Sequence, residues 1–165
     1  MGIDYIYANH TKKQYFDVGL FGGSCRLRSA GFGLGSRALS LLISESGSWN
    51  SDSIEMLSDV TDKSLFVSSE YTNISVEAEL LILDVDGVEY FKEESELDFT
   101  TFSNLCLYAM TLRRQEVIDL MDKMYGSGVW QKMYKDHYRE HTSRMEHAIY
   151  EAQARNIVLY RKHNV

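Results

Sequence analysis

Runs of apolar side chains near the start of the chain predict two short β-strands. Residues 3–8 and 14–18 are rich in aromatic and β-branched residues, which favour extended backbone. Between them, residues 9–13 have the sequence Asn-His-Thr-Lys-Lys, which combines turn formers with charge. A strand, a polar turn and a second strand in this order predict a β-hairpin.

The next part of the chain predicts one helix and a second pair of strands. Residues 38–43 are an apolar run that predicts a short helix. Residues 53–59 and 65–69 predict two strands, joined by a turn at residues 61–63. These strands would enlarge the sheet that the hairpin begins.

Two further helices are predicted from their capping residues. Ser75 is a suitable N-cap for a short helix through Leu83, although the same segment could be a strand that ends at Val85. Asp98 or Thr100 can cap a helix that continues through a long apolar run. The chain therefore changes from mixed structure to helix near residue 98.

The last third of the chain predicts helices throughout. The apolar face continues through residues 117–124 and stops at the glycines of residues 126–128. Residues 130–152 then keep an apolar spacing of three and four, which predicts one long amphipathic helix with a Tyr/Met stripe. Residues 157–160 could either add an edge strand or finish this helix.

Taken together, these elements predict an α+β fold. An N-terminal antiparallel hairpin and small sheet are followed by a helical C-terminal half. A chain of 165 residues is expected to form one domain, residues 1–165, with a mixed part at 1–97 and a helical part at 98–165. This size suffices to bury roughly two thirds of the surface of the unfolded chain.

Composition indicates a reducing compartment. The two cysteines, Cys25 and Cys106, do not belong to a Cys-x-x-Cys pair. The N-terminus lacks the basic start and apolar core of a signal peptide, and no apolar run reaches the length of a membrane span. We therefore expect a cytoplasmic protein.

Negative charge is concentrated in the middle third of the chain. Residues 45–98 contain 15 acidic residues and two basic ones, whereas the segments on either side are neutral or mildly basic. Such a band repels nucleic acid and anionic membrane and attracts basic partners at rates that fall with salt. Interleaved aromatic and aliphatic residues indicate that the band is folded, because a disordered acidic segment lacks them.

The hairpin sequence resembles a known group of proteins. Residues 7–16, Tyr-Ala-Asn-His-Thr-Lys-Lys-Gln-Tyr-Phe, are similar to the opening of a scattered family of small intracellular proteins, which begin with a strand, an Asn-x-Thr-Lys-Lys-x-Tyr turn and a second strand. A later tryptophan and a short acidic strand match residues 49–59. The same part of the chain also resembles bacterial immunity proteins. The resemblance covers about the first sixty residues and implies a fold but no activity.

A glycine-rich segment, residues 22–35, precedes the first predicted helix. Bare backbone amides ahead of a helix N-terminus can bind a phosphate. Arg28, Gly31 and Gly33 are similar to the pyrophosphate loop of acetyl-CoA-dependent N-acetyltransferases, which implies acyl-CoA or nucleotide binding. The alternative is a flexible connector whose glycines let the helix pack closely.

Asp84 and Asp86 follow an apolar run. This arrangement resembles the first motif of haloacid-dehalogenase-type phosphatases, in which a strand delivers a nucleophilic aspartate and an acid/base aspartate to a Mg²⁺ site. No downstream pair of metal-binding aspartates accompanies it. The simpler interpretation is an acidic turn.

His137 and His141 are one helical turn apart and could bind a metal together. A zinc site needs at least a third protein ligand, and Tyr138 stands where the metalloprotease motif has glutamate. Packing histidines on the Tyr/Met stripe are the simpler interpretation.

The charge and the missing catalytic set favour a binding protein. We predict a cytoplasmic protein that neutralises a basic partner, in the manner of a bacterial immunity protein that blocks a toxin. Carboxylates would steer association and aromatic side chains would supply much of the affinity. The predicted partner-binding residues are Trp49, Asp52, Glu55, Asp59, Asp62, Glu70 and Tyr71.

Two alternatives remain open. One is a small enzyme that uses the glycine-rich segment, in an acetyltransferase-like reaction, or the Asp84/Asp86 pair with Mg²⁺. The other is a regulatory or scaffold module that forms a homodimer through the Tyr/Met stripe. The leading interpretation needs no catalytic residue, cofactor or metal, and no nucleic acid or membrane partner.

Overall fold

The chain forms two compact units, and the second is inserted in the sequence of the first. The computed structural model describes residues 5–17, 34–58, 61–88, 99–137 and 142–161. The first unit comprises Met1–Asp84 and Asn156–Val165, and the second comprises Val85–Arg155. The units therefore meet in sequence after residue 84, whereas our sequence-based division fell after residue 97.

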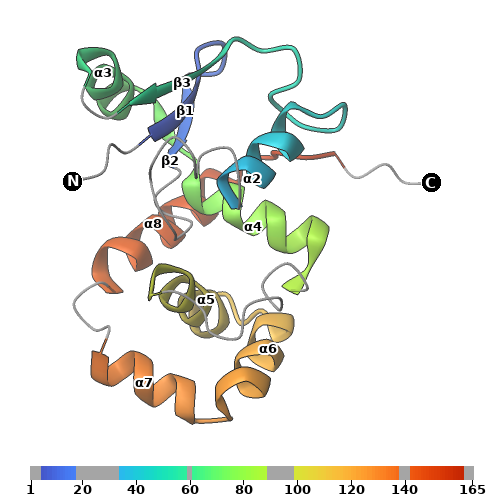
Figure 1. Cartoon of the computed structure of the whole chain (residues 1–165), viewed down its shortest axis with the longest axis vertical. Coiled ribbons are helices and arrows are strands. Elements are labelled where there is room, and N and C mark those ends of the chain that lie inside the picture. The colour runs from blue at the N-terminus through green and yellow to red at the C-terminus, as the bar shows by residue number, and fades with distance from the viewer. Residues whose placement is uncertain (1–4, 18–33, 59–60, 89–98, 138–141, 162–165) are drawn as a thin grey trace. The chain divides into compact units, whose positions relative to one another are not determined.

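The predicted α+β class is confirmed, with the strands in the N-terminal half (Figure 1). The first unit contains a four-stranded sheet of order β3-β1-β2-β4, in which β1 is antiparallel to β2 and β3, and β2 is parallel to β4. The strands are β1 Tyr5–Asn9, β2 Gln14–Asp17, β3 Ile54–Ser58 and β4 Thr72–Asn73.

The β1–β2 turn has the geometry that its polar sequence allows. The Asn9 side-chain oxygen accepts a hydrogen bond from the backbone N–H of Lys12 at 2.8 Å, so the first strand ends in a side-chain-stabilised turn. Lys13 closes the turn with a φ of 56°. The resulting register pairs Tyr7 with Phe16, and the hairpin prediction is confirmed.

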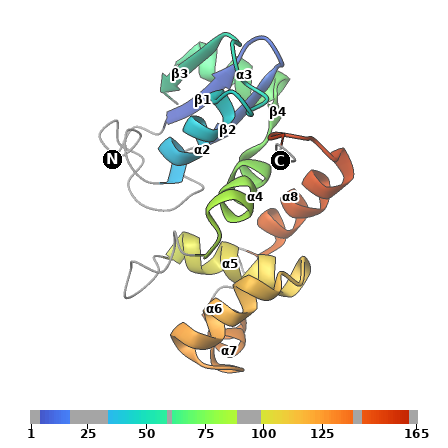
Figure 2. The same ribbon diagram turned by 90° about the vertical axis from the view of Figure 1, so that its right-hand side faces the viewer.

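Alternation along the strands gives the sheet two buried faces. Tyr7 and Phe16 point to one face, where they join a core that also includes side chains of helices α2 (Leu34–Ile43) and α4 (Ser75–Asp86). The opposite face carries Ile6, Ala8, Tyr15 and Leu57, which pack against Val67 of helix α3 (Asp62–Glu70). Figures 1 and 2 show α2 and α3 on opposite sides of the sheet.

The predicted turn at 61–63 and strand at 65–69 are wrong, because these residues form α3. Thr61 is the N-cap, and its side-chain oxygen accepts a hydrogen bond from the Ser64 N–H at 3.2 Å. The apolar run 65–67 has β propensity, but only Val67 of the three is buried. One buried position in three fits a helix that lies on a sheet.

Helix α4 confirms the predicted helix through Leu83, and the alternative of a strand ending at Val85 is wrong. The Asn73 side chain accepts hydrogen bonds from both the backbone N–H and the hydroxyl of Ser75. The Ser75 hydroxyl oxygen in turn accepts the Asp17 N–H at 2.9 Å. Ser75 therefore begins the helix and also ties it to the end of β2.

The described part of the second unit is helical. Arg113, with a φ of 52°, lies between helices α5 (Phe99–Thr111) and α6 (Gln115–Tyr125). Gly126, with a φ of 103°, ends α6, where the sequence predicted a glycine stop. Two helices occupy the region where we predicted one long helix, and residues 138–141 between them lie outside the described residues. The helices are α5 Phe99–Thr111, α6 Gln115–Tyr125, α7 Val129–His137 and α8 Thr142–Arg155.

The segment after α8 returns to the first unit. The Leu159 carbonyl accepts the Ser48 N–H at 2.8 Å, and Tyr160 forms an isolated antiparallel bridge with Gly47. Leu159 is buried in the core that contains α2 and α4. A Cβ atom at Gly47 would collide with the Leu42 carbonyl oxygen, so the close approach of Gly47 to Leu42 requires glycine. Residues 157–160 are therefore neither a strand of the four-stranded sheet nor part of α8, which ends at Arg155.

None of the described helices is long and apolar enough to cross a lipid bilayer.

Candidate functional site: the exposed face of helix α3

Helix α3 leaves two large apolar side chains in solvent. Leu65 is 64 % exposed and Phe66 is 57 % exposed, whereas Val67 is 1 % exposed and packs on the sheet. Successive helical residues are rotated by about 100°, so Leu65 points roughly away from the side that carries Val67. The helix therefore buries one face and presents another that its own unit does not cover.

The exposed face of α3 has carboxylates at both ends. Asp62 begins the helix and Glu70 ends it, and both side chains are exposed. Residues three and four apart share a helix face, which places both carboxylates beside the apolar pair Leu65 and Phe66. Neither carboxylate takes part in an ion pair with another described residue. We call Asp62, Leu65, Phe66, Glu70 and the adjoining Tyr71 the α3 surface.

Tyr71 connects this surface to the β1–β2 turn. Its ring meets the Phe66 ring edge-on, with centroids 6.2 Å apart, and meets the His10 ring in the same way at 5.8 Å. The Tyr71 hydroxyl lies 2.9 Å from His10 Nδ1, and Lys13 Nζ lies 5.1 Å from the centre of the Tyr71 ring. These contacts hold the aromatic group in place, so its ordering costs little when a partner binds.

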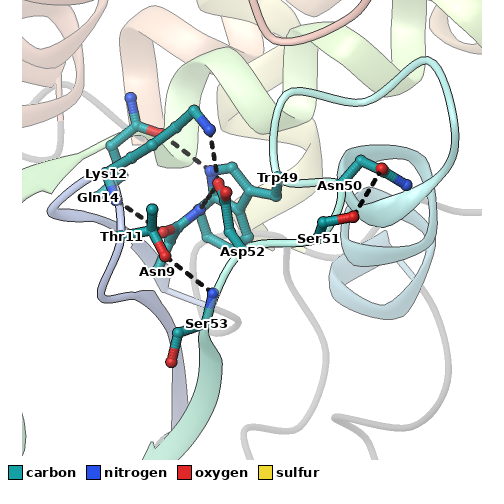
Figure 3. A network of polar contacts seen from close by, with 9 residues as sticks. All are labelled: Asn9, Thr11, Lys12, Gln14, Trp49, Asn50, Ser51, Asp52 and Ser53. Carbon is teal, nitrogen blue, oxygen red and sulfur yellow. Dashed lines mark hydrogen bonds and ion pairs between the residues drawn. The ribbon is translucent and has the colours of Figure 1, made fainter.

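Asp52 is held by the hairpin turn (Figure 3). Its Oδ2 accepts hydrogen bonds from Asn9 Nδ2 at 2.8 Å and from Lys12 Nζ at 2.6 Å. The hydrogen bonds from Asn9 and then from Lys12 lower the pKa of Asp52. Only 11 % of the Asp52 side chain is exposed. The charge of Asp52 is therefore largely used within the first unit.

Glu55 is paired in a similar way on the α3 side of the sheet. Its Oε1 lies 2.7 Å from Lys63 Nζ and 2.8 Å from His10 Nε2. The hydrogen bond from Lys63, followed by that from His10, lowers the pKa of Glu55. The Glu55 side chain is 37 % exposed, so solvent still reaches it.

Trp49 is not a surface residue, and its predicted role as a partner-binding side chain is wrong. It is 0 % exposed and packs against Phe16 with ring centroids 5.6 Å apart. Its indole N–H donates to Gln14 Oε1 at 2.9 Å, as Figure 3 shows. The hydrogen bond allows the tryptophan to be fully buried. Asp59, another predicted residue, lies outside the described residues.

The structure therefore divides the predicted patch. Asp62 and Glu70 are exposed and adjoin the partly buried Tyr71, whereas Asp52 and Glu55 are bonded to lysines of their own unit. The sequence reasoning missed Leu65 and Phe66, because it assigned them to a strand. It also missed the side chains that bond to these carboxylates, which are His10 and Lys12 of the hairpin turn and Lys63 of α3. The signal for His10 and Lys12 was a polar turn whose side chains can pair with carboxylates of a neighbouring segment.

Asp84 and Asp86 do not have the geometry of the phosphatase motif. They lie in the last turn of α4, not after a strand. Residues two apart are separated by about 200° around a helix, so the two carboxylates do not converge as a shared Mg²⁺ site requires. The acidic-turn interpretation is also wrong in detail, since both residues are helical.

The other candidate sites fall mainly outside the described residues. Of the glycine-rich segment 22–35, only its last two residues are described, at the start of α2. His137 is the last residue of α7, and His141 lies outside the described residues. Within the described part of the chain, no three His, Cys, Asp or Glu side chains are grouped to hold a metal ion.

No protein-family model matches this chain, and no curated protein or solved structure is significantly similar to it.

Proposed function

We propose that the protein binds and neutralises a basic protein partner through the α3 surface. The observation that carries the proposal is the exposure of Leu65 and Phe66, at 64 % and 57 %, between the carboxylates Asp62 and Glu70. Buried aromatic and aliphatic anchors inside a polar rim are the usual source of affinity at a protein interface. The α3 surface offers both components on one short helix.

Charge specifies the kind of partner. Asp62 and Glu70 form no ion pair with another described residue, so a cation that approaches either one displaces none of the described cations. Residues 45–98 contain 15 acidic and two basic residues, and this negative charge adds a long-range attraction for basic proteins. We therefore expect Lys or Arg side chains around an apolar centre on the partner.

Within this proposal, we infer that the partner is a bacterial toxin and that the protein acts as its cytoplasmic immunity protein. The carboxylates would occupy the positions at which the toxin binds the phosphates of its substrate, and the apolar pair would hold the complex together. The resemblance of residues 7–16 to an immunity-protein-like hairpin is compatible with this role. Cys106 fits a reducing compartment, because it is a free, buried thiol.

Nuclear magnetic resonance of the full chain tests the binding surface. The probe is a short peptide in which lysine alternates with leucine, and the control peptide has the same sequence with acetylated lysines. We expect chemical-shift changes at residues 62–71 with the first peptide and much smaller changes with the second. Binding that shifts other residues and leaves 62–71 unchanged would contradict the proposal.

Variants separate this surface from general charge attraction. Asp62→Lys with Glu70→Lys should weaken peptide binding at least about fivefold, and so should Leu65→Ser with Phe66→Ser. Asp136→Lys with Glu151→Lys is the matched control, since it makes the same change in net charge at exposed positions of the second unit. An equal effect of the control pair would show that α3 is not the binding surface.

Bacterial growth tests the toxin assignment. Each basic toxin domain encoded beside the gene for this protein is expressed together with the wild-type chain or with the Asp62→Lys/Glu70→Lys variant. We expect the wild type to restore growth and the variant to fail. If the wild type restores growth against none of them, the immunity role is wrong even where the peptide binds α3.

A further inference from the structure

The pairing of Glu55 points to a second binding element beside the α3 surface. Both of its side-chain partners, Lys63 and His10, bond to one oxygen, Oε1. No described residue forms a hydrogen bond with the other oxygen, Oε2. With 37 % of the side chain exposed, this carboxylate can accept a further donor from outside the chain.

Lys63 is a weakly held partner. Its side chain is 58 % exposed, although the ammonium group lies 2.7 Å from the carboxylate. Exposed lysine–carboxylate pairs contribute little to stability, because both groups are well solvated when separated and the long lysine side chain loses freedom when paired. An incoming cation can therefore displace Lys63 at small cost.

His10 makes the site more than a surface ion pair. The imidazole lies between Glu55 Oε1 and the Tyr71 hydroxyl, at 2.8 Å and 2.9 Å, so the carboxylate is fixed in relation to the aromatic part of the α3 surface. Its side chain is 25 % exposed, and the hairpin turn positions it. A fixed carboxylate keeps its orientation when Lys63 leaves.

We propose that Glu55 is a cation-binding subsite of the α3 surface, occupied by Lys63 in the free protein and by a lysine of the partner in the complex. In the free protein, the Lys63 ammonium group occupies the position that the partner's ammonium group takes in the complex. Lys63 thus competes with the partner's lysine for Glu55, and this competition weakens binding of the partner. This inference rests on the proposed function of the α3 surface.

Removing the competing cation is the direct test. Lys63→Met keeps the apolar part of the side chain and should tighten binding of the lysine–leucine peptide by about twofold to fivefold. Lys132→Met, at an exposed position of α7, makes the same change in net charge and is the matched control. In a Glu55→Gln background, Lys63→Met should bind no better than Lys132→Met does in the same background.

The outcomes separate the two proposals. If the peptide shifts residues 62–71 but Lys63→Met and Lys132→Met bind it equally, the subsite is wrong and the α3 surface stands. If the wild-type protein does not bind the peptide at α3, the proposed function fails and the subsite fails with it. A salt dependence that steepens in Lys63→Met, but not in Lys132→Met, supports the subsite.

Discussion

Two pairs of carboxylates from the same acidic band differ in what they contact. Asp52 and Glu55 are bonded to cations of the hairpin turn and of α3, whereas Asp62 and Glu70 form no ion pair with a described residue. The first pair joins segments that are about 40 residues apart in sequence, such as Asn9 and Asp52. The second pair flanks apolar side chains that solvent covers. Charge in the sequence therefore has two uses here, one in stability and one, as we propose, in binding.

The largest expected difference between the regions is in packing. Trp49→Ala should lower the free energy of unfolding by about 3 to 5 kcal/mol, because it empties a buried site against Phe16 and leaves Gln14 without its indole donor. Phe66→Ala, which removes an exposed ring, should change it by about 0.5 kcal/mol or less. Urea unfolding measures both. A similar loss in the two variants would contradict the assignment of Phe66 to a free surface.

A smaller difference is expected between the carboxylates themselves. Asp52→Ala should cost about 1 to 3 kcal/mol, since it leaves the amide of Asn9, a 0 % exposed residue, without its acceptor. Glu70→Ala removes an exposed carboxylate from a helix C-terminus and should stay within about 0.5 kcal/mol. Urea unfolding of both variants is the measurement. Equal costs would mean that the two pairs do not differ as the contacts indicate.

The smallest expected effect is a difference in pH dependence. Native contacts lower the pKa of Glu55 from its ordinary value of 4.5 and that of Asp52 from 3.8. Both groups bind protons more weakly in the folded state, so their contribution is present above these values and is lost as the pH falls through the lowered native pKa. Unfolding of the wild type should therefore become easier below about pH 4.5.

Asn and Gln substitutions assign that dependence to residues. Asp52→Asn with Glu55→Gln should flatten stability against pH in the acid range. Urea midpoints measured from neutral pH to pH 3 compare this double variant with the wild type. The assignment fails if the double variant keeps the wild-type dependence on pH.

Local signals in the sequence were sufficient for much of the first unit. The hairpin, β3 and α4 were predicted from turn residues, β-branched runs and a capping serine, all of which act within a few residues. Helix α3 was missed, because a three-residue apolar run has β propensity and only tertiary packing shows that Val67 alone is buried. For a short segment, contact with the rest of the fold outweighs local preference.

The site was harder to predict than the fold. The acidic residues between 52 and 70 were predicted as one patch, but the division of that patch depends on which side chains reach each carboxylate across the sheet. The Lys12–Asp52 and His10–Glu55 pairs exist only once β1 and β3 are in register. Trp49 was misplaced for a related reason, since a tryptophan beside acidic residues in sequence can still be the centre of a core.

The return of the tail has a consequence for synthesis on the ribosome. Leu159 completes the core that Tyr7, Phe16 and Trp49 begin, and the backbone of residues 159–161 bonds to residues 46–48. The first unit is thus begun by the earliest strands and cannot close until residues 157–161 have left the exit tunnel. The inserted helices emerge before that moment, so they can fold while the nascent N-terminal sheet still lacks its final segment.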